Sequence, residues 1–238
     1  MNVRMSVKGL AGLVGLTCSA IAAPLVAQVG HPPQRSPYID LEYRQEATMF
    51  GGYYNAGTDQ VGVAPQGGPM LGLRYDLRLG GPAALTTKFA YVSSQRTIID
   101  PRRPEEQRVV ESNASWPLYI ADVGISLNLT GQRSYRRLVP FINGALGVAT
   151  DFKGDADVGA WRFGTPFAFS FGGGIKWVPA GNLQVRMDLS DQLYQIKYPN
   201  SYYVTSSDGT SVLGPRDDTS DWTNNFGISF GVSYLFFR

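Results

Sequence analysis

Few side chains in this sequence are suited to acid–base or nucleophilic chemistry. There is one histidine, His31, and one cysteine, Cys18. A general base must be held beside its nucleophile and its substrate, but His31 lies in a proline-rich stretch ahead of the first expected strand. We therefore predict that the protein is not an enzyme.

Two stretches rich in acidic residues could suggest a calcium site. They are 151–157, which contains three aspartates, and 208–221, which contains four. Neither matches the ligand spacing of an EF-hand loop, and aspartate is common in turns because its side chain hydrogen-bonds the nearby backbone. We interpret both stretches as solvated loops and predict neither a metal nor a cofactor.

Other charged residues alternate with apolar residues inside longer segments. In 70–79, for example, Arg74 and Asp76 alternate with leucines and a tyrosine. Acids and bases balance in this set, and buried charges persist only when they are paired. We predict that they form ion pairs in a closed interior, as structural lumen charges of a barrel: Asp40, Glu42, Arg44, Arg74, Asp76, Lys88, Asp122, Lys176, Arg186 and Asp188.

The elements that position these charges have a strict period of two. Near the end of the chain, every second residue is large and apolar, whereas the residues between them are mostly Gly or Ser. This apolar row consists of Phe226, Ile228, Phe230, Val232, Tyr234 and Phe236. A period of two over this length predicts a β-strand long enough to cross a bilayer at a tilt.

The same alternation divides the chain into eight segments, and an even number is usual for bacterial barrels. We expect strands at 38–49, 70–79, 83–94, 116–129, 139–150, 166–178, 183–197 and 223–237. Short connections rich in Gly, Pro and Asn alternate with long ones, which is typical of periplasmic turns and extracellular loops. In the segment 139–150, Ile142, Leu146 and Val148 favour one register and Phe141 the other.

The polar face of these strands is rich in Gly, Ser and Ala, with few long charged side chains. Small residues and paired charges suit the interior of a narrow barrel, so we assign the apolar face, including the closing row 226–236, to lipid. Aromatic residues near strand ends then form the expected girdles: Tyr91, Tyr119, Phe152, Trp177 and Tyr198. The sequence thus predicts an all-β, eight-stranded, antiparallel up-and-down transmembrane β-barrel.

The N-terminal region has the features of a secretory signal peptide. Arg4 and Lys8 precede an apolar run, and small residues follow, which predicts cleavage after Ala23 or Ala27. We expect a signal peptide at 1–27, a proline-rich periplasmic lead at 28–37 and a barrel at 38–238. Removal of Arg4 and Lys8 from the 21 basic residues balances the 19 acidic ones, so the chain lacks the basic surface of a nucleic-acid-binding protein.

Three stretches of the sequence resemble the family of small bacterial outer-membrane β-barrels that includes the OmpA transmembrane domain and the OmpX and OmpW types. They are Pro140–Gly147, the run Phe171–Trp177 followed by Leu183–Leu189, and the aromatic final strand. Family members usually end on an aromatic residue, whereas here Arg238 follows two phenylalanines. The resemblance implies the fold and a place in the outer membrane far more than an activity.

We therefore expect an exported, integral outer-membrane protein with a structural or surface-interaction role through its loops. Its expected partners are outer-membrane lipid, lipopolysaccharide and, during insertion, the barrel-assembly machinery, with no nucleic acid; the sequence identifies no surface ligand. One alternative is an OmpW-like channel for small hydrophobic molecules, although the sequence gives no clearly apolar lumen at the outer end. A second alternative is a secreted, lipocalin-like carrier whose apolar rows face inward.

Overall fold

The computed structural model describes residues 36–179 and 181–236. The predicted signal peptide and nearly all of the proline-rich lead lie outside these residues. Among the helices of the described part, none has the length and apolar character needed to cross a membrane.

The described chain is built almost entirely from strands and their connections. The strands are β1 (Tyr38–Asp40), β2 (Gln45–Asn55), β3 (Gly68–Gly80), β4 (Ala83–Val92), β5 (Gln95–Ile99), β6 (Val109–Ser115), β7 (Leu118–Asn128), β8 (Arg133–Tyr135), β9 (Leu138–Thr150), β10 (Phe167–Trp177), β11 (Leu183–Lys197) and β12 (Ser220–Phe236), with two short 3₁₀ helices, η2 (Glu105–Gln107) and η3 (Asn200–Tyr203).

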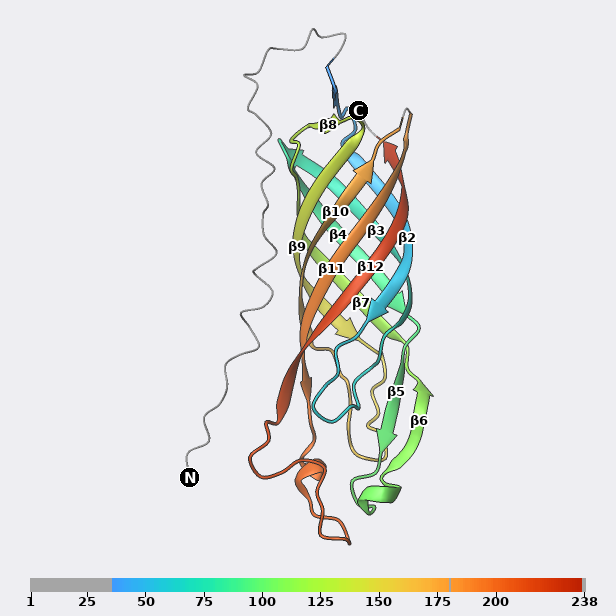
Figure 1. The fold of residues 1–238 in the computed structure, drawn as a ribbon, viewed down its shortest axis with the longest axis vertical. Coiled ribbons are helices and arrows are strands. Elements are labelled where there is room, and N and C mark those ends of the chain that lie inside the picture. Colours follow the sequence, from blue (N-terminus) through green and yellow to red (C-terminus); the bar gives the residue numbers. More distant parts are fainter. Residues whose placement is uncertain (1–35, 180, 237–238) are drawn as a thin grey trace, which may run out of the picture. The chain divides into compact units, whose positions relative to one another are not determined.

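Eight of these strands close into an antiparallel barrel (Figure 1). Around the ring the order is β2, β3, β4, β7, β9, β10, β11, β12, and β12 pairs again with β2. This confirms the predicted up-and-down barrel. The short connections lie at one end, here called the turn end, and the long ones at the other, called the loop end.

The strands are staggered as they pass around the barrel. One row of partners runs Tyr234, Ala47, Tyr75, Thr87, Val123, Leu146, Phe169, Leu193 and Asn224. The row leaves β12 at Tyr234 and returns to it at Asn224, a shift of ten residues. A stagger of this size requires strands tilted by roughly 40° to the barrel axis.

The register of β9 is settled by Phe141, which points inward, while Ile142, Leu146 and Val148 are exposed outside. An aromatic ring fits in the narrow interior because the neighbouring strand has a glycine there. A Cβ added to Gly174 would lie 2.9 Å from Cζ of Phe141. The glycine-rich run in β10 thus leaves room for this ring.

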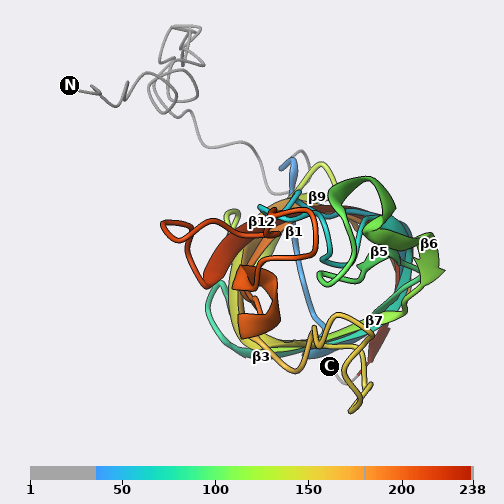
Figure 2. The same cartoon turned by 90° about the horizontal axis from the view of Figure 1, so that it is seen from below.

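The first expected strand, 38–49, is wrong in its bounds. β1 lies outside the barrel wall and pairs with β8, in the turn between β7 and β9. The first strand of the wall, β2, begins only at Gln45. Because β2 and β9 lie on opposite sides of the ring, residues 41–44 must cross the turn end. Figure 2 shows this segment in blue inside the ring of strands.

Candidate functional site

Arg186, on β11, is the centre of a buried charged network inside the barrel. Its Nη1 donates to Glu46 Oε1 at 3.1 Å and to Asp76 Oδ2 at 2.7 Å. Its Nε and Nη2 donate to the two carboxylate oxygens of Asp188 at 2.9 and 3.0 Å. This planar, bidentate geometry is what a guanidinium provides and a lysine does not.

Two further ion pairs extend the network across the lumen: Arg74 with Asp188 at 2.9 Å and Lys176 with Glu46 at 2.8 Å. A separate inward pair, Lys88 with Asp122 at 2.9 Å, joins the neighbouring strands β4 and β7. All these side chains are buried. Opening a path for ions through them would leave buried charges unpaired, at a cost of several kcal/mol per charge. The network therefore places buried, paired charges in the middle of the barrel.

Hydroxyl and amide groups complete the network on its turn side. Oε1 of Glu46 also accepts hydrogen bonds from Gln184 Nε2 at 2.6 Å and Ser233 Oγ at 2.9 Å. The ring of Phe141 lies 4.7 Å from the Arg186 guanidinium carbon, a cation–π distance. Glu46 and Arg186 thus each meet partners on several strands, so these contacts tie the barrel wall together.

Seven of the ten expected lumen charges lie in this interior: Arg74, Asp76, Lys88, Asp122, Lys176, Arg186 and Asp188. The assignment of Asp40, Glu42 and Arg44 to the lumen is wrong, because the chain has not yet entered the wall and all three are exposed. Asp40 pairs instead with Arg133, at 2.9 Å, on the exposed β1–β8 ladder.

Glu46 is a further lumen charge, which the sequence prediction did not include. It lies at an even position, as do Glu42 and Arg44, and the row continues inward through Thr48 and Phe50. Following that row two residues further would have identified it.

The segment 41–44, here called the mouth segment, covers the turn end. The backbone amide of Leu41 donates to Gln132 O at 2.9 Å, which attaches it to the β7–β9 turn. Nη1 of Arg78 donates to Leu41 O at 2.7 Å, and its guanidinium carbon lies 4.7 Å from the centre of the Tyr43 ring. The Tyr43 hydroxyl donates to Gln184 Oε1 at 3.3 Å, joining the segment to the charged network.

The loop-end half of the interior is apolar, which contradicts the expectation drawn from the sequence. Strand residues pack there against residues of the long loops. The core contains Phe50, Tyr54, Val63, Ala64, Met70, Ala90, Val92, Ile99, Leu118, Ile120, Ala149, Trp161, Phe163, Ala168, Tyr194, Ile196, Tyr198, Tyr202 and Leu213. Since loop side chains such as Trp161 and Leu213 fill this half, the loops close the barrel from outside.

Hydrogen bonds to buried polar groups connect the long loops to one another. The carboxylate of Asp59 accepts hydrogen bonds from the amides of Val63 and Ala64 and from the hydroxyl of Tyr198, the last at 2.9 Å. Burial raises the pKa of Tyr198 above its usual range, and Asp59 raises it further. The expected place of Tyr198 in an aromatic girdle is therefore wrong, because its ring is buried among the loops.

A second set of buried contacts joins the β4–β7 connection, at β5, to the loop after β9. The guanidinium of Arg96 is fully buried, pairs with Asp157 and lies between two indole rings, 4.5 Å from Trp116 and 4.0 Å from Trp161. Lys153 lies over the ring of Trp116 at 3.4 Å. Stacked cations of this kind stabilise a loop cluster when they are shielded from water.

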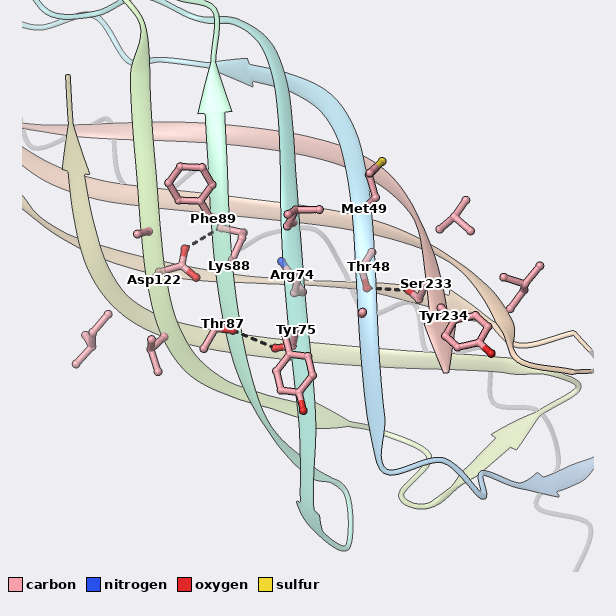
Figure 3. A pocket seen from close by; sticks show the side chains of 17 residues that line it. Thr48, Met49, Arg74, Tyr75, Thr87, Lys88, Phe89, Asp122, Ser233 and Tyr234 are labelled. Carbon is pink, nitrogen blue, oxygen red and sulfur yellow. Dashed lines mark hydrogen bonds and ion pairs between the residues drawn. The ribbon is translucent and has the colours of Figure 1, made fainter. Parts of the chain in front are cut away.

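The outer face of the barrel is apolar. The six residues of the closing row alternate with buried Gly, Ser and Leu residues along β12. A groove of about 770 Å³ is lined mostly by outward side chains, among them Met49, Tyr75 and Phe89, and also by the buried Lys88 and Asp122. Figure 3 shows the side chains that line it. Aromatic residues lie exposed near both strand ends, including Tyr91 and Phe152 at the loop end and Trp177 at the turn end.

No metal cluster offers a different site in the described part of the chain. Within 36–179 and 181–236 there is no group of three or more His, Cys, Asp or Glu residues placed to hold a metal ion. The main polar arrangement inside the described barrel is thus the charged network, with a cluster of loop residues at the loop end.

Comparison with known proteins supports the fold. No protein-family model matches the sequence, and the search of curated proteins found no match. Among solved structures, the chain is similar to outer membrane protein OprG from Pseudomonas aeruginosa, with a TM-score of 0.51 and 11% identity over 84% of this chain and 100% of that one.

It is also similar to neisserial surface protein A, with a TM-score of 0.50 and 11% identity over 81% of this chain and 97% of that one. At this identity the similarity concerns the fold alone. The chain has the fold of the small outer-membrane β-barrels.

Proposed function

We propose that the protein is an integral outer-membrane β-barrel whose lumen is closed and whose extracellular loops carry a structural or surface-interaction role. The observation that carries this proposal is the contrast between an apolar exterior and an interior obstructed at three levels. The mouth segment, the charged network and the loop core lie one above another along the barrel.

The height of the apolar exterior fits a membrane. β10 has 11 residues, with Phe167 and Trp177 at its ends. At about 3.3 Å per residue and a tilt of roughly 40°, it spans roughly 25 Å along the barrel axis, the height of the apolar band in outer-membrane barrels. Acyl chains would occupy the exterior groove of Figure 3.

The loops favour a binding surface over a gate. The stacked Arg96 and the hydrogen-bonded Asp59 hold loops from different hairpins in one cluster. A cluster with buried anchors keeps its shape when a partner approaches, which lowers the entropic cost of binding. We therefore place the binding surface at the loop end, which faces the cell exterior.

An OmpW-like channel for hydrophobic molecules is a second candidate, favoured by the apolar loop-end half of the interior. In the structure, however, buried side chains of the strands and loops fill this loop-end half. The lipocalin-like carrier is less well supported, because it needs an apolar cavity and a polar exterior, whereas here the charges lie inside and the apolar rows outside.

Conductance across a planar bilayer tests the closed lumen. The purified full-length protein should give no steady current above the bare bilayer, because moving ions would break buried pairs. Steady single-channel openings, or saturable uptake of a hydrophobic probe into proteoliposomes, would contradict the proposal and favour the channel. A general porin inserted in the same bilayer is the positive control.

A further inference from the structure

A cavity of about 390 Å³, here called the rim cavity, lies at the loop end beside the tops of β10 and β11. It is formed by two stretches, 160–166 and 195–199. The only charged residues among those that line it are Arg162 and Lys197, so its charge is wholly positive.

Both cations are exposed, and no ion pair joins either of them to a carboxylate in the described part of the chain. Several other cations of the barrel wall and loops, such as Arg186 and Arg96, have an acidic partner. The positive charge of the rim cavity is therefore available to an anion.

The backbone at the two cationic residues is held by buried neighbours on either side. Arg162 lies between Trp161 and Phe163, both buried: the Trp161 ring stacks on Arg96, and the Phe163 ring meets that of Tyr194 edge-on at 5.7 Å. The turn before Arg162 is fixed by Asp157, whose carboxylate accepts the amide of Trp161 at 2.9 Å.

Lys197 has the same arrangement, because Ile196 and Tyr198 on either side of it are buried. A ligand would therefore meet two charges on fixed backbone. Only the ends of the two side chains would have to be ordered, which limits the entropic cost of binding.

The position of the cavity points to the level of lipid headgroups. Below it on the outer face, Phe169 contacts both Phe167, at 5.0 Å between ring centres, and Trp222, at 6.4 Å. Lys197 is four residues beyond Leu193, the partner of Phe169 in the sheet. That places Lys197 roughly 10 Å further along the barrel axis than Leu193, just above an aromatic belt.

We infer that the rim cavity binds the phosphorylated headgroup of an outer-leaflet glycolipid such as lipopolysaccharide, with acyl chains lying on the aromatic patch formed by Phe167, Phe169 and Trp222. Arginine recognises phosphate through paired N–H donors, and lysine adds a point charge beside it. This inference rests on the proposed membrane location and adds a specific lipid partner to it.

Lipid binding to the full-length protein in detergent, followed by native mass spectrometry, tests the inference. The probes are bisphosphorylated lipid A, the same lipid without its phosphates, and inorganic phosphate. The wild type should bind the phosphorylated lipid most tightly, because charge and acyl contact act together. Equal binding of both lipids would overturn the role of the cations, and equal affinity for inorganic phosphate would overturn the role of the lipid.

Variants locate the site. Arg162→Gln and Lys197→Gln should each weaken binding of phosphorylated lipid A about fivefold, and the double variant about 25-fold, as expected for basic residues at a lipid surface. Arg102→Gln/Arg103→Gln is the matched control, since it also removes two exposed loop cations. A loss in the control and none in the rim double variant would overturn the assignment.

The proposed function is tested separately in the same samples. A rim variant that keeps the heat-dependent gel mobility of a folded barrel, yet binds lipid A as the wild type does, contradicts only the lipid site. A wild type without such a mobility shift contradicts the membrane barrel itself.

Discussion

Arg186 joins three carboxylates through one planar group, and this explains why the interior tolerates so much charge. Glu46, Asp76 and Asp188 come from β2, β3 and β11, so the contacts cross the lumen as well as following the wall. Buried pairs of this kind add little compared with an apolar core, but removing one partner is costly because the others stay buried and charged.

We therefore expect Arg186→Ala to destabilise the barrel by about 3 to 5 kcal/mol, the usual cost of breaking a buried pair. Urea unfolding of the refolded protein in detergent would measure the loss. Arg102→Ala is the control: its side chain is exposed, and its pair with Asp100 should change stability by less than about 1 kcal/mol. If both variants unfold at the wild-type urea concentration, the network does not stabilise the barrel.

Asp208 gives a prediction for pH. Hydrogen bonds from the Ser206 hydroxyl and from the amides of Thr210 and Glu105 hold the pKa of its carboxyl well below the usual range. A carboxyl group whose pKa is lower in the folded than in the unfolded state stabilises the fold at pH values above its unfolded-state pKa. This stabilisation is lost as the pH falls through the folded-state pKa. The contact between Glu105 and Asp208, 2.7 Å long, should therefore persist at pH 4.

Nuclear magnetic resonance can follow the amide of Thr210, which donates to Asp208 Oδ1 at 3.0 Å, through an acid titration. Its shift should move only below the ordinary aspartate range, and in Asp208→Asn the acid-dependent movement should disappear. A midpoint at or above pH 4 in the wild type would contradict the predicted shift.

Among the elements, the mouth segment depends most on a single side chain. Arg78 donates to Leu41 O and stacks on Tyr43, so Arg78→Ala should release the segment while leaving the wall paired. Losing a charged hydrogen bond of about 1.5 to 3 kcal/mol should speed amide exchange in 41–44 about tenfold or more.

Hydrogen exchange with mass spectrometry would detect this release in a peptide covering 38–48. Arg133→Ala, which removes the exposed pair with Asp40, should leave exchange in 41–44 nearly unchanged. Equal protection in wild type and Arg78→Ala would contradict the role given to Arg78.

The elements that sequence predicts well are those whose signal is local. Alternation predicted β11 at 183–197, as the structure has it, and placed the ends of the other wall strands, except β2, within three residues of their observed positions. The detour of β1 has no such signal, because it depends on pairing with β8 far along the chain. The stacking of Arg96 between Trp116 and Trp161 was equally hidden, since the three residues meet only through tertiary contact.

For the whole molecule, polarity is inverted relative to a soluble barrel. Charges lie inside, where they pair, and apolar rows lie outside over roughly the height of a bilayer core. The same reasoning from alternation located most lumen charges, but it misjudged the outer half of the interior, because loop residues such as Trp161 and Leu213 supply much of that core.

The central claim, a closed barrel embedded in the outer membrane, is tested most directly by fractionating producing cells and running the membrane fraction on gels with and without boiling. We predict recovery in the outer membrane and a mobility that changes on boiling, as a barrel held by its wall pairs unfolds only with heat. Recovery as a soluble periplasmic protein with no mobility change would contradict the account.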